Sequence, residues 1–295
     1  MPRTSFDALL EAGAHFGHLK RKWNPNIAPY VFGEKNGIHI IDLNKTLAKL
    51  EEAANALKQV AKSGRTVLFV ATKKQAKNII AEKIKEINMP CVTERWTGGM
   101  LTNFATIRRS VRKMTDMNKM ATDGTLDTLS KKEKLQLSRQ REKLEHQLGT
   151  IANMTRLPAA VFVVDITKEH IAISEARKLN IPTFAIVDTN SDPNKVDFAI
   201  PANDDSSTSI RVIVDTICQA IREGLEERKE AQVSNKQEDR KEEEVVAMDD
   251  SAEEGIEVDD DAEVPEVGAP KGVDKMAKSG KEKKVAPRRP TKLNK

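Results

Sequence analysis

One short segment contains the residue types best suited to binding chemistry. Residues 94–104 place an Arg-Trp pair, Arg95 and Trp96, ahead of the flexible pair Gly98-Gly99, and a cationic helix is expected to follow. Guanidinium groups bind phosphate oxygens in pairs, and an indole face can stack on a nucleobase. This combination suits a phosphate-and-base surface better than a small-molecule pocket, so the segment predicts contact with RNA.

A second cationic group adjoins an indole near the amino terminus. Lys20, Arg21 and Lys22 directly precede Trp23, whose indole could either lie on a base or sugar or anchor its loop to the core. In both groups we expect the cations to hold phosphates and the tryptophans to stack or pack. The predicted RNA-contacting residues are Lys20, Arg21, Lys22, Trp23, Arg95, Trp96, Arg108, Arg109, Arg112 and Lys113.

Charge is distributed unevenly along the 295-residue chain, whose net charge is +4. Residues 237–266 contain 15 Asp and Glu against 2 Lys and Arg, whereas residues 267–295 contain 10 Lys and Arg against 2 Asp and Glu. Residues 1–236 therefore carry a net charge of +9, which favours a polyanionic partner. The sequence has no apolar run of membrane-spanning length and no amino-terminal signal pattern, so we expect a cytoplasmic protein without a membrane partner.

Outside residues 102–151, apolar strands alternate with amphipathic helices. Residues 66–71, 159–164 and 182–187 are mostly or wholly apolar, which is typical of parallel strands buried on both faces. The chain is therefore predicted to be an α/β protein with a doubly wound, mostly parallel sheet. Helices are expected near residues 43–61, 76–87 and 168–179, and after a cap at Asp205 or Ser206.

Between residues 102 and 151 the pattern changes to two narrow helical stripes, joined by the turn residues Thr122-Asp123-Gly124. We expect a coiled-coil-like helical hairpin inserted into an α/β domain that comprises residues 1–101 and 152–225. Residues 226–295 have few large apolar side chains and blocks of like charge, so we expect them to be a disordered tail, acidic and then basic. Capping boxes are predicted at Thr72 with Gln75 and at Ser130 with Glu133.

A doubly wound sheet also allows an alternative, a nucleotide-dependent enzyme that uses the crevice at the carboxyl ends of the strands. The loop in question reads Thr72-Lys73-Lys74-Gln75, and no glycine-rich phosphate loop follows any strand, so dinucleotide binding is disfavoured. Thr72, Lys73, Lys74 and Lys77 could still meet phosphate at a helix amino terminus, or simply form a solvated helix start.

Other residues with catalytic or metal-binding chemistry lack partners nearby in the sequence. Asp165 and Asp188 follow strands and could act as bases, but no nucleophile, histidine or second carboxylate lies in the same segment, so we expect no catalysis, no cofactor and no small-molecule substrate. His15 and His18 have no recognisable third and fourth ligands, which favours a packing or hydrogen-bonding role over a metal site. A scaffold that binds only proteins is a third alternative.

Several strings of the sequence form a recognisable set. They are His15-Phe16-Gly17-His18, Trp23-Asn24-Pro25, residues 95–104, Asp188-Thr189-Asn190, Asp192-Pro193 and residues 200–205, with Asp165, Glu175, Ala176 and Ile181 at matching offsets between Pro158 and Pro182. Together these strings are similar to the bacterial family of small-subunit ribosomal protein number two. The resemblance covers about residues 4–228, in order, and leaves the tail uncovered.

The resemblance implies a flavodoxin-like parallel sheet with a projecting helical hairpin, placed between the head and the body of the small ribosomal subunit. It implies contacts with small-subunit ribosomal RNA and with neighbouring ribosomal proteins, including the large messenger-binding protein. The implied role is that of a structural constituent of the ribosome in translation, without catalysis.

Overall fold

A computed structural model describes residues 3–123 and 130–253 of the chain, with side chains described as far as residue 233. The chain divides into two units, Met1–Lys241 and Glu242–Lys295, and the candidate site lies within the first. Within the described ranges, no helix is both long enough and apolar enough to span a lipid bilayer.

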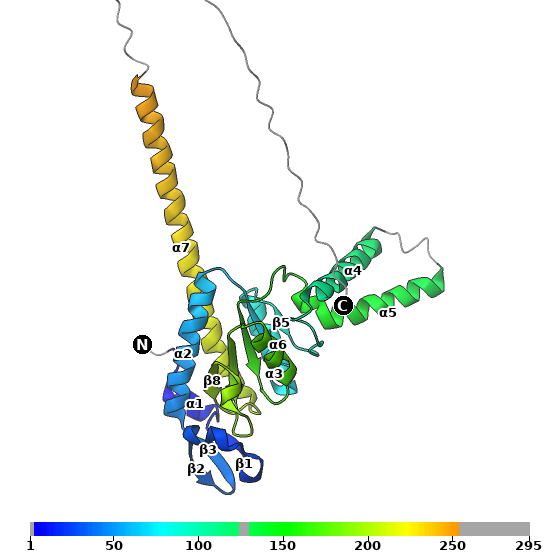
Figure 1. Ribbon diagram of the computed structural model, residues 1–295, viewed down its shortest axis with the longest axis vertical. Coiled ribbons are helices and arrows are strands. Elements are labelled where there is room, and N and C mark those ends of the chain that lie inside the picture. The colour runs from blue at the N-terminus through cyan, green and yellow to red at the C-terminus, as the bar shows by residue number, and fades with distance from the viewer. Residues whose placement is uncertain (1–2, 124–129, 254–295) are drawn as a thin grey trace, which may run out of the picture. The chain divides into compact units, whose positions relative to one another are not determined.

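A five-stranded parallel sheet forms the centre of the first unit (Figure 1). Its strands are β4 (Val67–Val70), β5 (Cys91–Val92), β6 (Ala160–Val164), β7 (Thr183–Val187) and β8 (Phe198–Pro201). The spatial order β5-β4-β6-β7-β8 reverses direction between β4 and β6, as in flavodoxin-like doubly wound sheets. The predicted fold class is therefore confirmed.

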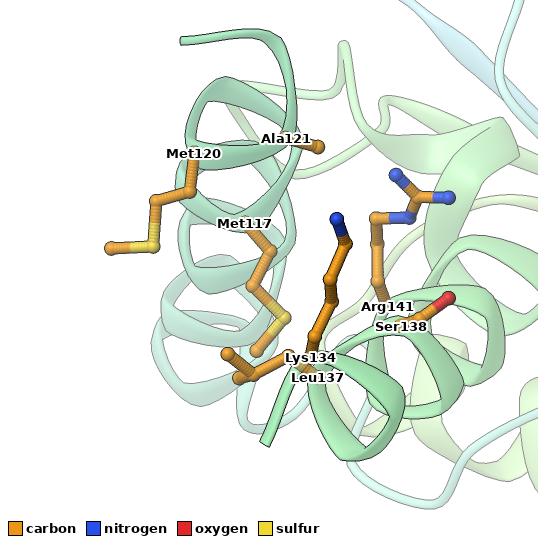
Figure 2. Close-up of a pocket in the computed structure, with 7 residues that line it drawn as sticks. All are labelled: Met117, Met120, Ala121, Lys134, Leu137, Ser138 and Arg141. Carbon is orange, nitrogen blue, oxygen red and sulfur yellow. The ribbon is translucent and has the colours of Figure 1, made fainter. Parts of the chain in front are cut away.

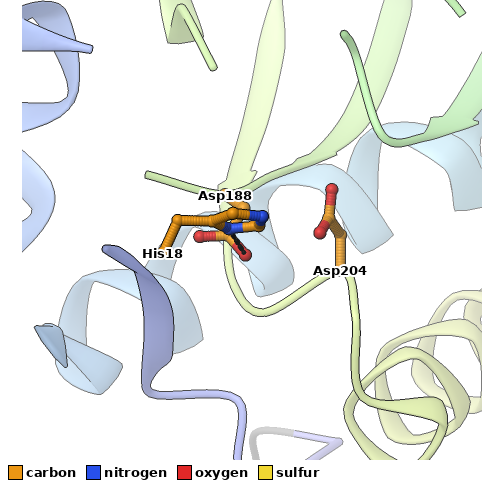
Figure 3. A group of neighbouring side chains, drawn as sticks. All are labelled: His18, Asp188 and Asp204. Atoms are coloured by element: carbon orange, nitrogen blue, oxygen red, sulfur yellow. Dashed lines mark ion pairs between the residues drawn. The ribbon is translucent and has the colours of Figure 1, made fainter. Parts of the chain in front are cut away.

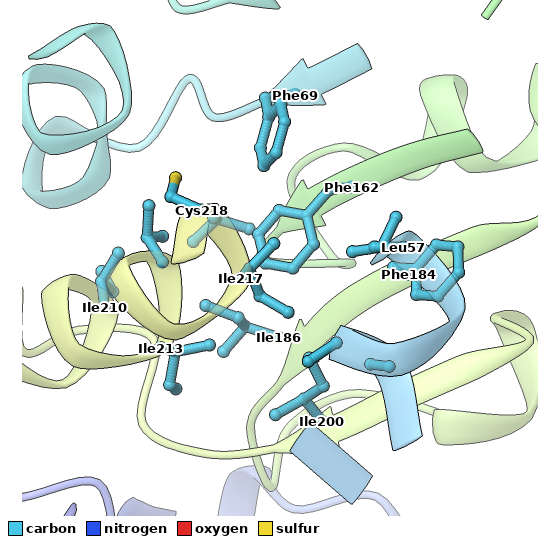
Figure 4. Close-up of a cluster of buried hydrophobic side chains, with 14 of the residues drawn as sticks. Leu57, Phe69, Phe162, Phe184, Ile186, Ile200, Ile210, Ile213, Ile217 and Cys218 are labelled. Carbon is cyan, nitrogen blue, oxygen red and sulfur yellow. The ribbon is translucent and has the colours of Figure 1, made fainter. Parts of the chain in front are cut away.

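Helices cover both faces of this sheet because successive strand residues point to opposite sides. Phe69, Phe162 and Phe184 occupy neighbouring strands in register and fill one core together with Leu57 and Ile217 from the covering helices (Figure 4). The alternate strand residues face a second core, which is closed by α6 and the base of the hairpin. The helices of the first core are α2 (Leu43–Lys62), α3 (Lys74–Glu86) and the start of α7 (Ser207–Glu253), and α6 is His170–Lys178.

The amino-terminal residues form a three-stranded antiparallel sheet that our sequence analysis did not predict. Asn36 and Gly37 both have positive φ, 54° and 76°, as the tight turn between two of its strands requires. The loop after β7 holds this sheet, since Thr189 accepts hydrogen bonds from the backbone N–H of His18 (2.7 Å) and of Asn24 (2.8 Å). The elements are α1 (Phe6–Glu11), β1 (Phe16–Leu19), η1 (Lys20–Lys22), η2 (Pro25–Tyr30), β2 (Val31–Lys35) and β3 (Ile38–Ile41), in the sheet order β1-β3-β2.

The inserted hairpin consists of α4 (Phe104–Thr122) and α5 (Lys131–Leu148), which lie side by side (Figure 1). α5 begins with the predicted capping box of Ser130 and Glu133, and it ends in the short helix η4 (Gly149–Ile151). Between residues 131 and 143 no α5 side chain is fully buried, so this part of the hairpin packs only between its two helices. Of the predicted turn, Gly124 lies outside the described residues.

Two further predictions concern helix starts. α3 begins at Lys74 without a side-chain cap, because the hydroxyl of Thr72 donates to the carboxylate of Glu169 instead. The capping box predicted at Thr72 and Gln75 is therefore wrong. At the start of α7, Ser206 is the cap, since its Oγ accepts a hydrogen bond from the backbone N–H of Ser209 at 3.4 Å.

α7 continues to Glu253, although we predicted a disordered tail from residue 226. Residues 226–253 are rich in Glu, Lys, Arg, Gln and Ala, which all have high helix propensity, so helix can persist there without the apolar stripe on which our prediction relied. A helix of polar residues there is compatible with a tail outside the packed α/β domain, and the bounds of the predicted tail, residues 226–295, stay a prediction. For residues 254–295, which lie outside the described residues, the predicted disorder also stays a prediction.

Candidate nucleic-acid interface

The loop that joins β5 to α4 wraps around one carboxylate, that of Glu175 on α6. Four backbone or ring N–H groups donate to it, from Trp96 Nε1 (3.1 Å), Gly99 (2.7 Å), Leu101 (3.0 Å) and Thr102 (3.1 Å). The hydroxyl of Thr102 adds a fifth bond at 3.2 Å. Gly99 has a φ of +85°, a conformation that glycine adopts without strain and that lets the loop reverse around the carboxylate.

Glu175 remains ionised in this setting although it is only 7% exposed. Burial alone would raise the pKa of its carboxyl group, but the hydrogen bonds from Thr102, Gly99, Trp96 and Leu101 outweigh burial and hold that pKa below its usual value. In the sequence, Glu175 stands out only through the family resemblance. An acidic residue on the apolar face of a short helix was the signal that could have identified it.

The cations predicted on the hairpin lie in the first turns of α4. Arg109, Arg112 and Lys113 are exposed and have no hydrogen-bond or ion-pair partner among the described residues. Arg108 differs, because it is half-buried and its guanidinium donates to the backbone carbonyl of Thr155. Three unpaired cations in adjacent helical turns can bind phosphates without first breaking internal ion pairs.

Arg95 and Trp96 are neighbours in sequence but have different environments. Arg95 is exposed and unpaired within the described part of the chain, as a phosphate contact requires. Trp96 is 7% exposed and packs in the second core, with its ring N–H bonded to Glu175. We predicted that this indole would either stack on a base or pack in the protein, and in the structure it packs in the second core.

The amino-terminal cations lie on the short helix η1. Arg21 and Lys22 are exposed, whereas Lys20 forms an ion pair with Glu34 at 2.7 Å. Trp23 is partly buried, and its ring centroid lies 4.9 Å from that of His39. Trp23 and Trp96 border the same core, but no hydrogen bond or ion pair among the described residues joins the η1 cations to those of α4.

The crevice at the carboxyl ends of the strands is occupied by ion pairs. Nζ of Lys73 lies 2.8 Å from Asp204, 2.7 Å from Asp205 and 3.7 Å from Asp165. Burial would lower the pKa of Lys73, but its hydrogen bonds to Asp204 and Asp205 raise that pKa above the usual value. Lys77 likewise pairs with Glu94. These cations are engaged internally, which argues against the predicted alternative of a phosphate site in the crevice.

His18 lies close to two buried carboxylates in the same region (Figure 3). Its Nδ1 is 2.9 Å from Oδ2 of Asp188, and this contact raises the pKa of the imidazole. Burial, aided by repulsion from Asp188, raises the pKa of Asp204 to about 7. Ligand atoms of His18, Asp188 and Asp204 lie within 4.8 Å of one another and could hold a divalent cation. His15 is not among them, because its ring packs on Phe16.

A cavity of about 250 Å³ lies between α4 and α5, away from the crevice (Figure 2). Its lining is mainly apolar, and Nε of Arg141 is buried there without a hydrogen-bond partner among the described residues. The volume is small for a drug-sized ligand. The lining residues are Met117, Met120, Ala121, Lys134, Leu137, Ser138 and Arg141.

The fold and the site define a class of protein, an α/β scaffold with an inserted hairpin. Internal ion pairs fill its crevice, and the hairpin carries cations that are unpaired among the described residues. Residues 9–224 match the family model described as ribosomal protein S2. The chain belongs to this family, and it is a structural protein of the ribosome and not an enzyme.

Curated relatives are similar over most of their length. The protein named small ribosomal subunit protein uS2 of Phocaeicola vulgatus is 66% identical over 233 residues, which cover 79% of this chain and 84% of the relative. The protein of the same name from Bacteroides fragilis is 66% identical over 229 residues, covering 78% and 82%. That of Azobacteroides pseudotrichonymphae is 64% identical over 228 residues, covering 77% and 87%.

Proposed function

We propose that this chain is built into the small ribosomal subunit in the cytoplasm, where it binds small-subunit ribosomal RNA mainly through the exposed cations of α4. One observation supports the assignment of RNA binding to α4. Arg109, Arg112 and Lys113 are solvent-exposed and have no acidic partner among the residues that the structure describes. Phosphate binding by such residues releases counterions and costs no internal ion pair.

Further contacts extend this surface. Arg95 supplies an exposed cation in the loop that leads into α4, and Arg21 and Lys22 supply a separate contact on η1. Arg108 and Lys20 contribute less, because each already has an internal partner. Trp96 packs in the second core and Trp23 packs against it, so both contribute to the scaffold that carries these cations. Neighbouring small-subunit proteins, including the large messenger-binding protein, are the proposed protein partners, and they follow from the family.

The test removes two charges from α4. An Arg109→Ala/Arg112→Ala variant is expected to bind small-subunit ribosomal RNA more weakly, and its plot of log affinity against log salt should be shallower by about two. The matched control is Arg211→Ala/Lys229→Ala, which removes two exposed cations from α7 instead. Equal slopes for the first variant and the unmodified chain would exclude α4 as the RNA-binding helix.

Sedimentation tests the wider assignment. The chain is expected to co-migrate with small ribosomal subunits in a cell extract and to lose its RNA partner after RNase treatment. A complex that resists RNase would support the alternative of a scaffold that binds only proteins.

A further inference from the structure

Glu175 connects the α/β scaffold to the base of the cationic hairpin. The segment that it holds begins at Trp96, one residue after Arg95, and ends at Thr102, two residues before α4 begins at Phe104. Both ends of the held segment therefore lead directly into proposed RNA-binding groups. No other carboxylate among the described side chains receives hydrogen bonds from this segment.

We propose that Glu175 is a positioning residue of the RNA-binding surface, holding Arg95 and the first turns of α4 in the arrangement in which they bind phosphates together. The proposal rests on the proposed function. It assigns Glu175 no contact with RNA, since its carboxylate is buried and fully occupied by the loop.

The geometry favours a carboxylate at this position over a neutral side chain. Five donors face Glu175 from the loop, and four of them are N–H groups that cannot accept a hydrogen bond. An ionised carboxylate accepts at both oxygens. A glutamine of the same length would turn its NH₂ group toward N–H donors. The loop would then lose some of its bonds, and Arg95 would have to be ordered at the moment of RNA binding.

A purely stabilising role is the competing explanation, because α6 also buries Ala172, Ile173 and Ala176. Glu169 at the start of α6 offers a matched control. It is a buried glutamate like Glu175, but it accepts hydrogen bonds from Thr72 in the crevice and none from the β5–α4 loop. A general loss of stability should affect RNA binding equally in Glu169→Gln and Glu175→Gln.

The experiment compares RNA affinity, its salt dependence and thermal stability in the full-length chain. Glu175→Gln is expected to weaken binding to small-subunit ribosomal RNA about 10-fold and to lower the salt slope by about one. Glu169→Gln should change the Tm without changing affinity or slope. Trp96→Phe removes a single donor and keeps an aromatic ring, so it should weaken binding by a smaller factor even if Glu175→Gln does not fold.

A double-mutant cycle tests positioning directly. Arg95→Ala should weaken RNA binding less in the Glu175→Gln background than alone, whereas Arg21→Ala should have the same effect in both. The proposal is overturned if folded Glu175→Gln binds RNA with normal affinity and slope, or if Glu175→Gln and Glu169→Gln lose affinity equally. If Glu175→Gln does not fold, normal affinity in Trp96→Phe overturns it. Failure of the unmodified chain to bind RNA would instead refute the proposed function, and the proposal with it.

Discussion

Nζ of Lys73 lies 2.8 Å from Oδ1 of Asp204, so the loop after β4 is tied to the loop after β8. Asp204 is fully buried and the side chain of Lys73 is 12% exposed. In a nucleotide-binding relative of this fold class, the same crevice would receive the ligand. Here the protein's own charges fill it, and the pair contributes to the stability of the scaffold.

Removal of the Lys73 charge should therefore destabilise the fold. Lys73→Met leaves Asp204 buried without its partner, and the carboxyl then takes up a proton because its pKa is already raised to about 7. The cost is that of an unsatisfied buried polar group, about 1–3 kcal/mol of unfolding free energy. Urea denaturation measures the change, and Lys74→Met, at an exposed neighbouring site, should stay within about 0.5 kcal/mol of the unmodified chain. A similarly small change in Lys73→Met would show that the buried pair contributes little.

Two buried glutamates, Glu175 on α6 and Glu169 at its N-cap, should give opposite pH dependences of stability. Burial raises the folded-state pKa of Glu175, but its hydrogen bonds lower that pKa by more, so the net shift is downward. The contribution of Glu175 to folding stability is therefore present above about pH 4.3 and is lost as the pH falls through the folded-state pKa. The folded-state pKa of Glu169 is raised by burial, so its contribution is present below about pH 4.3 and is lost as the pH rises through the folded-state pKa.

The measurement is the free energy of unfolding between pH 3 and pH 8. The loss caused by Glu175→Gln should grow with rising pH, whereas the loss caused by Glu169→Gln should shrink. Parallel pH profiles for the two variants would contradict the assignment of these pKa directions.

Gly224 should not tolerate a side chain, because α7 approaches α2 closely there. A Cβ at Gly224 would lie 2.4 Å from the backbone carbonyl oxygen of Lys58, and backbone cannot move aside as a flexible side chain can. Gly224→Ala is expected to cost about 1–3 kcal/mol of stability despite the higher helix propensity of alanine. In Gly149→Ala the new methyl group has its nearest neighbour at 3.7 Å, so that variant should fold normally. Equal stability of the two variants in thermal denaturation would refute the close contact.

Neutralising Glu34 should strengthen RNA binding. Nζ of Lys20 and Oε2 of Glu34 are 2.7 Å apart at exposed positions, and Glu34→Gln would free the ammonium for a phosphate. We expect a few-fold higher affinity at low salt and a salt slope steeper by up to about one. Glu52→Gln is the matched control, because it frees Lys49 from a pair of the same length on α2. The idea fails if both variants bind RNA alike.

Sequence periodicity was sufficient to predict the sheet and the hairpin. β4, β6 and β7 are buried in every residue and read as apolar runs, and α4 and α5 have narrow stripes that match their mutual contact. These patterns involve residues that are close together in the chain, so they can be recognised in a single sequence. The antiparallel sheet was missed although Asn36-Gly37 is a strong hairpin signal, because its strands are short and irregular in register.

The candidate site was predictable only in part. Cations such as Arg109 and Arg112 can be listed from the sequence, but the sequence does not show that they are unpaired while Arg108 and Lys20 have internal partners. Glu175 and Gly99 are 76 residues apart, and Lys73 and Asp204 are 131 apart. Only the folded sheet brings such pairs together, so the packing of Trp96 and the filled crevice could not be read from spacing.

The two tryptophans of the chain are intrinsic fluorescence probes of two different regions. Trp23 reports on the antiparallel sheet, where its ring lies beside that of His39. Trp96 reports on the loop at the base of the hairpin, where its indole is enclosed in the core. Replacing either one with phenylalanine leaves a single tryptophan, so the assembly steps that involve each region can be followed by intrinsic tryptophan fluorescence without any added dye.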